Sequence, residues 1–344
     1  EHHPYPGVQT RFIDIGTLVQ IDLMIVLVLF RLEGVKNPMV QNGKLSRLVC
    51  SVLVTAAISF VAVIELASQR QPVSLDGVVD LHVHAGPDSR PRSVSDTQAA
   101  KAAQAAGMRA ILLKNHFTMT ADRAVLAMEQ VDGIEIFGGI VLNRAVGGIN
   151  PEAVRQMVQF AGGRGRVVWL PTFDAEWYVT NAGGGEAFVS IMQNGRPAPA
   201  VLEVFSLIGE YDLLLAMGHS APEEVLALIP EAIDRGVTRI LVTHVFSQGA
   251  SLEQMKEMAS TGALMEIDWL AVHNGGRTIT DYAEVIGEIG AEHFVMSSDL
   301  GQADTPLHHE GWELYIRAMQ EAGLSAVEIN RMARANPAFL LGLE

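Results

Sequence analysis

The chain has 344 residues and an acidic composition, with 24 Lys and Arg against 39 Asp and Glu and a formal net charge of −15. Binding to nucleic acid needs clustered Lys and Arg that neutralise phosphates, and the sequence contains no such cluster, so we expect no nucleic-acid partner. The single cysteine, Cys50, excludes an intramolecular disulfide. Any metal site must therefore use histidine and carboxylate ligands.

Residues 1–75 form an apolar segment that we expect to be helical. Residues 48–64 carry no charge and follow Lys44 and Arg47, a pattern typical of a secretory signal or an N-terminal anchor. The alternative is a set of apolar helices that pack on the main domain or on a partner subunit of a homo-oligomer. The protein is exported or associated with a membrane if residues 39–70 act as a signal or anchor, and cytoplasmic otherwise.

Residues 76–344 alternate short apolar runs with amphipathic segments. Helix signals separate the runs: Asn150 precedes Pro151, and Ser325 forms a capping-box pattern with Glu328. Such alternation predicts parallel strands covered by helices, and eight repeats of it predict an α/β fold, a (β/α)8 TIM barrel. An open doubly wound sheet shares the alternation, but the first run lacks a glycine-rich phosphate turn. The eight runs begin at residues 78, 109, 134, 166, 212, 239, 263 and 294.

Five of the 11 histidines fall at the ends of predicted strands, where barrel enzymes gather their reactive groups. His82 and His84 end the first strand, and because residues i and i+2 face the same side of a strand, both imidazoles point into the barrel mouth. His219 ends the fifth predicted strand, His244 the sixth, and Asp299 the eighth. Together these four histidines and Asp299 predict a metal site.

This order of residues resembles that of the amidohydrolase superfamily of metal-dependent hydrolases. The chain also ends in Asn-Pro-Ala-x-Leu-Leu-Gly-Leu, at residues 336–343, which is similar to an ending common in that superfamily. The resemblance implies one divalent cation, zinc first and manganese, iron or cobalt as alternatives. It implies that His82, His84 and Asp299 bind the metal at the tighter position. It also implies that His219 joins that metal in one-metal members or helps to bind a second ion in two-metal members. By the same resemblance His244 polarises the substrate carbonyl or binds a second ion, and Asp299 takes a proton from the attacking water.

The sequence departs from the superfamily in two respects. Two-metal members carry a carboxylated lysine, or a glutamate, at the end of strand four, and residues 167–177 contain no lysine. Asp174 and Glu176 are the acids there that could bridge two ions, and neither matches well, so we expect one cation per subunit. The N-terminal β-sandwich of many members is also missing. The chain therefore looks like the compact members, which include one-metal hydrolases and non-oxidative decarboxylases.

Two cationic side chains are candidates for binding substrate. Lys114 lies just inside the end of the second strand, where a buried ammonium is costly unless it meets an anion. It either binds a substrate carboxylate or a developing oxyanion, with His116 beside it, or forms an ion pair with Glu135 or Asp174. Arg90, in the loop after the first strand, either clamps a carboxylate or is a solvated loop charge.

Other polar residues near strand ends carry weaker signals. Asn143 and Arg144 follow the third strand and are further candidates for substrate contact. His308 and His309 follow the eighth strand, and we expect them to be surface histidines.

We expect a metal-dependent hydrolase that uses an activated water on the amide, lactone or ester carbonyl of a small-molecule substrate, carboxylated compounds included. The catalytic residues would be Asp299, His244 and Lys114, and the substrate-binding residues Lys114, His116 and Arg90. The alternative within enzymes is a non-oxidative decarboxylase or hydratase that uses a single metal. The alternative outside enzymes is a barrel kept for binding or scaffolding.

Overall fold

The computed structural model describes residues 73–182 and 187–343, and the structure is discussed for these residues alone. The predicted signal or anchor at residues 39–70 lies outside them, as does nearly all of the predicted apolar segment. Within the described residues, no helix combines the length and the apolar character that crossing a bilayer requires.

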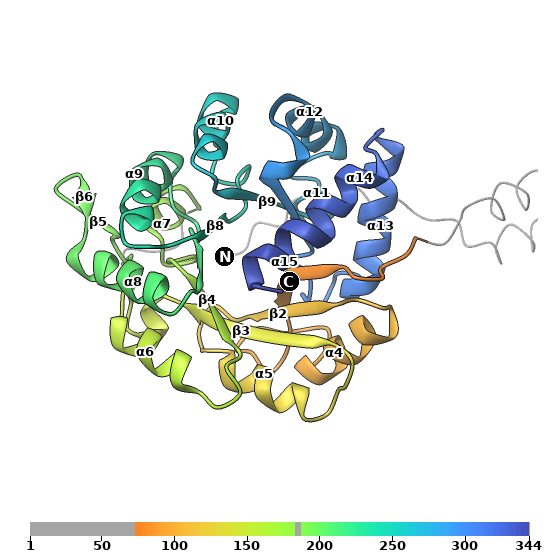
Figure 1. Cartoon of the computed structure of the whole chain (residues 1–344), viewed down its shortest axis with the longest axis horizontal. Helices are drawn as coiled ribbons and strands as arrows, with labels where there is room; N and C mark the ends of the chain where they lie inside the picture. The colour runs from red at the N-terminus through yellow and green to blue at the C-terminus, as the bar shows by residue number, and fades with distance from the viewer. Residues whose placement is uncertain (1–72, 183–186, 344) are drawn as a thin grey trace, which may run out of the picture. The chain divides into compact units, whose positions relative to one another are not determined.

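Eight parallel strands form the central sheet of the described residues, in the order β1-β2-β3-β4-β7-β8-β9-β10 (Figure 1). The sheet closes into a barrel because β1 also meets the chain just after β10, where the His84 N–H donates to the Leu300 carbonyl at 2.9 Å. All eight predicted strands are present, and the predicted (β/α)8 barrel is confirmed. The strands are β1 (Val79–His84), β2 (Ala110–Lys114), β3 (Glu135–Val141), β4 (Gly165–Trp169), β7 (Leu214–Ala216), β8 (Arg239–Val242), β9 (Leu264–Asp268) and β10 (Phe294–Ser297).

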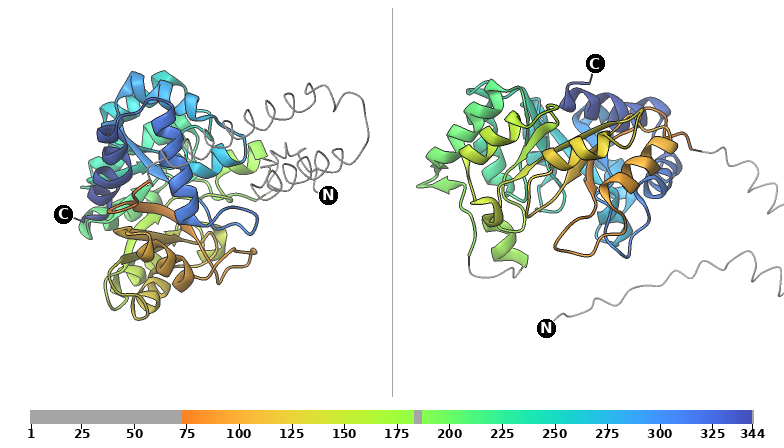
Figure 2. Two further views of the ribbon diagram at one scale, coloured as in Figure 1. Left: turned by 90° about the vertical axis from the view of Figure 1, so that its right-hand side faces the viewer. Right: turned by 90° about the horizontal axis from the view of Figure 1, so that it is seen from below.

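Helices follow the strands and lie outside the ring that the strands form (Figures 1 and 2). A short antiparallel pair, β5 (Met192–Gln193) with β6 (Arg196–Pro197), lies between α7 and α8 along the chain. The helices are α4 (Asp96–Ala105), α5 (Ala121–Met128), η1 (Arg144–Val146), α6 (Pro151–Gln159), α7 (Glu176–Ala182), α8 (Pro199–Glu210), α9 (Pro222–Ile233), α10 (Leu252–Ser260), α11 (Trp269–His273), α12 (Ile279–Ile289), η2 (Ala291–His293), α13 (His308–Glu321), α14 (Ala326–Asn330), η3 (Arg331–Ala335) and α15 (Asn336–Leu341).

The two predicted helix starts are confirmed. The Asn150 side chain accepts the Ala153 N–H at 3.2 Å, and α6 begins with a proline in its first turn. The Ser325 hydroxyl accepts the Glu328 N–H at 3.3 Å while the Glu328 carboxylate accepts the Ser325 N–H at 2.8 Å. Each bond satisfies a backbone donor that has no partner inside the helix.

The barrel has an inner core that α15 closes at the amino-terminal end of the strands. Leu340 and Leu341 of α15 pack with inner side chains such as Val79 and Leu241. Arg239, the first residue of β8, donates to the Phe339 carbonyl of α15 at 3.0 Å. Since this end is filled with apolar side chains, a site for polar chemistry is left to the carboxyl ends of the strands.

A shift of register in β1 aims its histidines into the barrel. Val79 and Leu81 belong to the inner core, whereas Val83 belongs to the outer core between strands and helices. The pairing of β1 with β2 shifts between Asp80 and Val83. Because of this shift, His82 follows Leu81 on the inner side of the barrel, which simple alternation along the strand would not allow.

Candidate active site

A pocket of about 730 Å³ lies at the carboxyl ends of the barrel strands. Its size falls within the range of small-molecule sites. The predicted site residues that line it are His84, Arg90, His116, His219, His244 and Asp299. The structure thus gathers predicted side chains from the ends of five strands, β1, β2, β7, β8 and β10, around one cavity.

One group of candidate metal ligands joins β1 to Asp299, two residues after the end of β10. His82 Nε2 lies 2.9 Å from Asp299 Oδ1, and His84 Nε2 lies 3.1 Å from the same oxygen. Ligand atoms of the three residues all lie within 4.8 Å of one another. Two imidazole nitrogens and a carboxylate oxygen that converge in this way can hold a divalent cation.

The other nitrogen of each of these two imidazoles is anchored. His82 Nδ1 donates to Glu266 Oε1 at 3.0 Å, and His84 Nδ1 donates to the Lys114 carbonyl at 3.1 Å. Since both acceptors can only accept, both protons sit on Nδ1 and the Nε2 atoms are the ones that face Asp299. Histidines that bind metals commonly have their second nitrogen held in this way.

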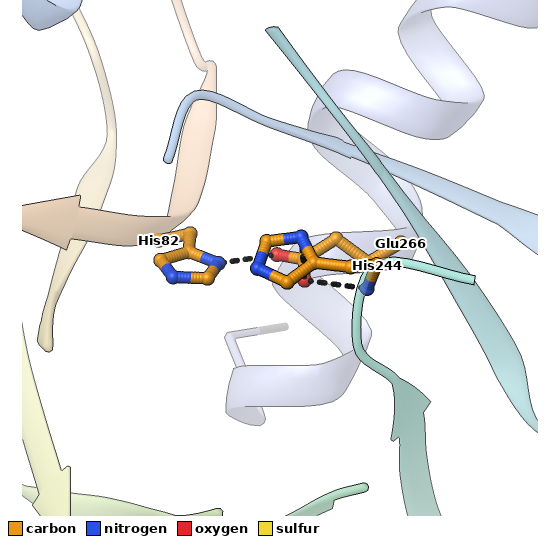
Figure 3. Close-up of side chains that lie close together, drawn as sticks. All are labelled: His82, His244 and Glu266. Atoms are coloured by element: carbon orange, nitrogen blue, oxygen red, sulfur yellow. Dashed lines mark hydrogen bonds and ion pairs between the residues drawn. The ribbon is translucent and has the colours of Figure 1, made fainter. Parts of the chain in front are cut away.

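Glu266, on β9, is a site residue that the sequence analysis did not select. Its Oε1 accepts from His82, and its Oε2 accepts the His244 backbone N–H at 3.2 Å (Figure 3). Glu266 Oε1 also accepts from the Ser297 hydroxyl at 2.7 Å. A usable signal was present, because Glu266 and Asp268 have the same i, i+2 spacing at a strand end as the two histidines of β1.

His244 is held by a carboxylate of its own. Its Nδ1 donates to Asp268 Oδ2 at 3.0 Å, while its Nε2 lies 3.6 Å from Asp299 Oδ2. His244 and Asp299 both have positive φ, 50° and 51°, a region that non-glycine residues seldom occupy. Each lies just after a strand, and such backbone strain is typical of functional sites.

His219 lines the same pocket but stands apart from the candidate ligand groups of the described residues. Its ring centroid lies 5.6 Å from that of His244. Its Nδ1 is buried and has no hydrogen-bond partner among the described residues. Buried nitrogens are nearly always paired, so an unpaired one in a residue that lines the pocket is a candidate ligand atom.

Lys114 is fully buried on the inner side of the barrel and is not among the residues that line the pocket. Its Nζ lies 2.9 Å from His82 Nε2 and 5.5 Å from the centre of the Trp169 ring. The alternative considered for Lys114, an ion pair with Glu135 or Asp174, is wrong. Glu135 instead pairs with Arg164, and Asp174 Oδ2 accepts the Arg144 N–H at 2.8 Å.

Burial and neighbouring charges set the ionisation of the ligand group. Burial lowers the pKa of His84 to about 3 and that of Lys114 to about 8. Burial also disfavours the charged form of His82, but the Asp299 and Glu266 carboxylates outweigh it and raise the pKa of His82 to about 9. His82 and His244 likewise outweigh burial at Asp299 and hold its pKa well below the usual value.

Asp174 and Glu176, the acids that match a bridging position poorly, belong to none of the candidate ligand groups of the described residues. One expectation about a histidine needs correction. His308 is buried and not at the surface: its Nε2 donates to the Leu300 and His84 carbonyls at 2.9 and 3.1 Å. His308 therefore ties the segment after β10 to the end of β1.

The fold and the site define a (β/α)8 barrel with histidines and carboxylates converging at the carboxyl ends of its strands. Residues 77–266 match the model of DUF6282, a family of unknown function, and the chain belongs to this family. No curated protein matches the sequence.

Solved structures share the barrel at low sequence identity. Organophosphorus hydrolase from Deinococcus radiodurans is 15% identical, with a TM-score of 0.53 over 78% of this chain and 93% of that chain. A triple mutant of that enzyme is 15% identical, with a TM-score of 0.54 over 78% of this chain and 94% of that chain. A third structure comes from the engineering of organophosphate hydrolysis activity from a weak promiscuous lactonase template. It is 14% identical, with a TM-score of 0.54 over 78% of this chain and 97% of that chain. At such identities the similarity shows the fold alone.

Proposed function

We propose that the protein is a metal-dependent hydrolase of the amidohydrolase superfamily that acts on the amide, lactone or ester carbonyl of a small substrate. The observation that carries this proposal is the convergence of His82 Nε2, His84 Nε2 and Asp299 Oδ1 at the mouth of the barrel. The solved structures that share the barrel are named as a hydrolase and a lactonase template, which favours hydrolysis over non-oxidative decarboxylation or hydration.

The donor set fits a divalent cation. Both ligating imidazoles keep their proton on Nδ1, the His84 ring stays neutral because its pKa is about 3, and the Asp299 carboxylate stays ionised. His219, whose buried Nδ1 lacks a partner among the described residues, is our candidate for a fourth ligand. A divalent cation held there would supply Lewis-acid chemistry, polarising a carbonyl and activating water near neutral pH.

A single cation is favoured over two. A second candidate group consists of His244, Asp268 and Asp299, but Asp268 Oδ2 is already occupied by the His244 Nδ1–H at 3.0 Å. A third group includes Glu266, whose two oxygens accept three hydrogen bonds from protein groups. Both acids are therefore engaged in orienting histidines, the usual role of carboxylates behind a metal site.

The remaining atoms of the site can hold and move protons. Asp299 Oδ1 faces the two ligating histidines, which leaves Oδ2 on the side of His244, and the carboxylate is 13% exposed to the pocket. Asp299 Oδ2 is placed to take a proton from the attacking water, since its carboxylate is ionised. His244, with its Nδ1–H fixed on Asp268, turns Nε2 toward the pocket and the substrate.

The first test is the metal content of the purified full-length protein, measured by elemental mass spectrometry after dialysis against Zn²⁺ and removal of excess ion. We expect about one equivalent in the wild type and a loss of most of it in His82→Ala with His84→Ala, because two of the ligands are removed. His293→Ala, on η2 and outside the pocket lining, is the matched control and should keep its metal.

The second test is turnover of phenyl acetate and of γ-butyrolactone by the loaded protein, followed by product analysis. Hydrolysis products that form with the wild type and not with the double mutant would support the proposal. A wild type that binds no cation would refute it. A loaded wild type that hydrolyses neither compound but releases CO₂ from a carboxylic acid would move the protein to the decarboxylases.

A further inference from the structure

Arg90 places a guanidinium without a protein counter-ion in the wall of the pocket. Its guanidinium carbon lies 4.3 Å from the centre of the Phe173 ring and 5.6 Å from that of Phe117, so two aromatic faces hold it in place. Within the described residues, this guanidinium makes no hydrogen bond or ion pair. Its neighbour Arg92 differs, because Arg92 Nε and Nη2 both contact Asp88 Oδ2 at 2.7 Å.

Arg92 has a carboxylate partner and Arg90 has none among the described residues, which indicates the charge of the ligand that the pocket binds. The chain carries 15 more acidic than basic residues, so carboxylates for pairing are abundant, and the Asp88 carboxylate is turned to Arg92 instead of Arg90. Arg90 is thereby left as an open, planar donor group. Such a fork binds the two oxygens of a carboxylate or phosphate.

His116 contributes a second donor to the same wall. Asn143 determines indirectly which nitrogen of His116 carries the proton. Asn143 Oδ1 accepts the Thr172 N–H at 2.8 Å, and Asn143 Nδ2 donates to the His116 carbonyl at 3.0 Å. These two bonds set the orientation of the Asn143 amide. Asn143 Nδ2 then also donates to Thr172 Oγ1 at 2.8 Å. Because Asn143 already donates to Thr172 Oγ1, we assign the Thr172 hydroxyl as the donor to His116 Nδ1, 2.8 Å away.

This relay determines the tautomer of His116. In this assignment Nδ1 accepts from Thr172 and the ring proton sits on Nε2, which has no hydrogen-bond partner among the described residues. The side chain lines the pocket, and therefore it offers an N–H there.

Phe173 links the two donors in a row that leads to the candidate metal ligands. Arg90 lies over the Phe173 ring, and the His116 ring centroid is 4.0 Å from the centroid of the same ring. His116 also stacks on His84, at 4.9 Å between centroids and 27° between planes. Trp177 and Tyr178 extend the aromatic wall of the pocket.

We propose that the substrate carries an anionic oxygen group, a carboxylate or a phosphate, that Arg90 binds against Phe173, while His116 Nε2–H donates to an oxygen nearer the metal ligands. This inference rests on the proposed function, since it takes the reacting carbonyl to lie at the His84 end of the row. It assigns recognition of the anion to Arg90, and not to Lys114, which is buried behind His82 and outside the pocket lining.

Binding of product-like probes tests the anion subsite without requiring turnover. We would titrate the Zn²⁺-loaded full chain with 4-hydroxybenzoate, phenyl phosphate and phenol, using calorimetry. We expect at least one anion to bind about tenfold more tightly than phenol, in keeping with one charge-assisted bidentate contact, and the tighter of the two identifies the anion. Arg90→Gln should reduce this preference to about twofold or less, and Arg90→Lys should restore only part of it.

Arg331→Gln, at an exposed position on η3, is the matched control and should keep the wild-type preference. Anions that bind no more tightly than phenol, or a preference that survives in Arg90→Gln, would overturn the anion subsite. Selective binding of an anion by a protein that hydrolyses no ester would overturn the proposed function alone. Hydrolysis of phenyl acetate without any preference for an anion would overturn this inference alone.

The tautomer of His116 has its own readout. In ¹⁵N spectra of the histidine-labelled protein, the His116 signals should report an unprotonated Nδ1 that accepts a hydrogen bond and a protonated Nε2. Thr172→Val removes the hydroxyl donor and should shift these signals toward the other tautomer. A protonated Nδ1 in the wild type would contradict the relay, whatever the activity of the protein.

Discussion

The indole N–H of Trp312, on α13, donates to Asp80 Oδ2 at 2.8 Å. The other oxygen of the same carboxylate accepts the backbone N–H groups of His82, at 3.1 Å, and of Ser298, at 3.0 Å. Asp80 is completely buried. It therefore ties the shifted register of β1 to both β10 and an outer helix, and this register is what turns His82 into the barrel.

Replacing Asp80 with alanine should destabilise the fold and weaken the metal site. Three buried donors would lose their acceptor, and we expect the free energy of unfolding in urea to fall by about 3 kcal/mol or more. Trp312→Phe leaves the two backbone donors paired and should cost less. An Asp80→Ala loss no larger than that of Trp312→Phe would show that the carboxylate does not hold β1.

Glu266→Gln should weaken cation binding while leaving the barrel folded. The amide that replaces the carboxylate can no longer accept every hydrogen bond from His82, Ser297 and His244, so the imidazoles lose their orientation. We expect the affinity for Zn²⁺ to fall about 10- to 100-fold, measured by competition with a chelator. Glu284→Gln, exposed on α12, is the control. Equal affinity in the two variants would exclude a supporting role for Glu266.

Asp268→Asn separates the one-cation arrangement from a two-cation arrangement. Asp268 accepts the His244 Nδ1–H, and an amide there would let His244 adopt the other tautomer. In the one-cation arrangement the variant keeps its metal content while kcat falls about 100-fold or more, as when a catalytic histidine loses its orienting carboxylate. A wild type that holds about two equivalents and a variant that holds about one would make Asp268 a ligand of a second ion.

Lys114→Met should strengthen cation binding. The Lys114 ammonium lies 2.9 Å from His82 Nε2, so it repels a cation bound to that nitrogen. Removing this charge from a buried site should tighten Zn²⁺ binding roughly tenfold or more. Lys101→Met, on an exposed position of α4, should change nothing. Weaker binding in Lys114→Met would mean that the lysine itself supports the ion.

Cation uptake should release a proton, and the affinity should rise with pH. The pKa of His82 is about 9 in the folded protein, above its usual 6.5, so protonation of His82 stabilises the metal-free fold below pH 6.5. That contribution is lost as the pH rises through about 9. A cation needs the unprotonated nitrogen, so the apparent affinity should increase about tenfold per pH unit and level off near pH 9. Calorimetry in buffers of different ionisation enthalpy would count the released proton.

The sequence alone determined the eight strands, their alternation with helices and the placement of His82, His84, His219, His244 and Asp299 at strand ends. These features follow from local periodicity and from a property shared by all such barrels, that the carboxyl ends of parallel strands meet at one mouth. The helix starts at Asn150 and Ser325 are likewise local, because a cap and its acceptor lie within one turn.

The tertiary structure alone decided which buried groups meet. The partners of Lys114, Glu266 and Asp80 come from strands and helices that are distant in sequence, and a one-residue shift in β1 changes which side chains face inward. Sequence spacing cannot specify such partners, because each contact needs two atoms on separate elements to lie within a hydrogen-bond distance of about 3 Å. For the same reason only the fold could separate Arg90 from its neighbour Arg92, one facing an open pocket and the other a carboxylate.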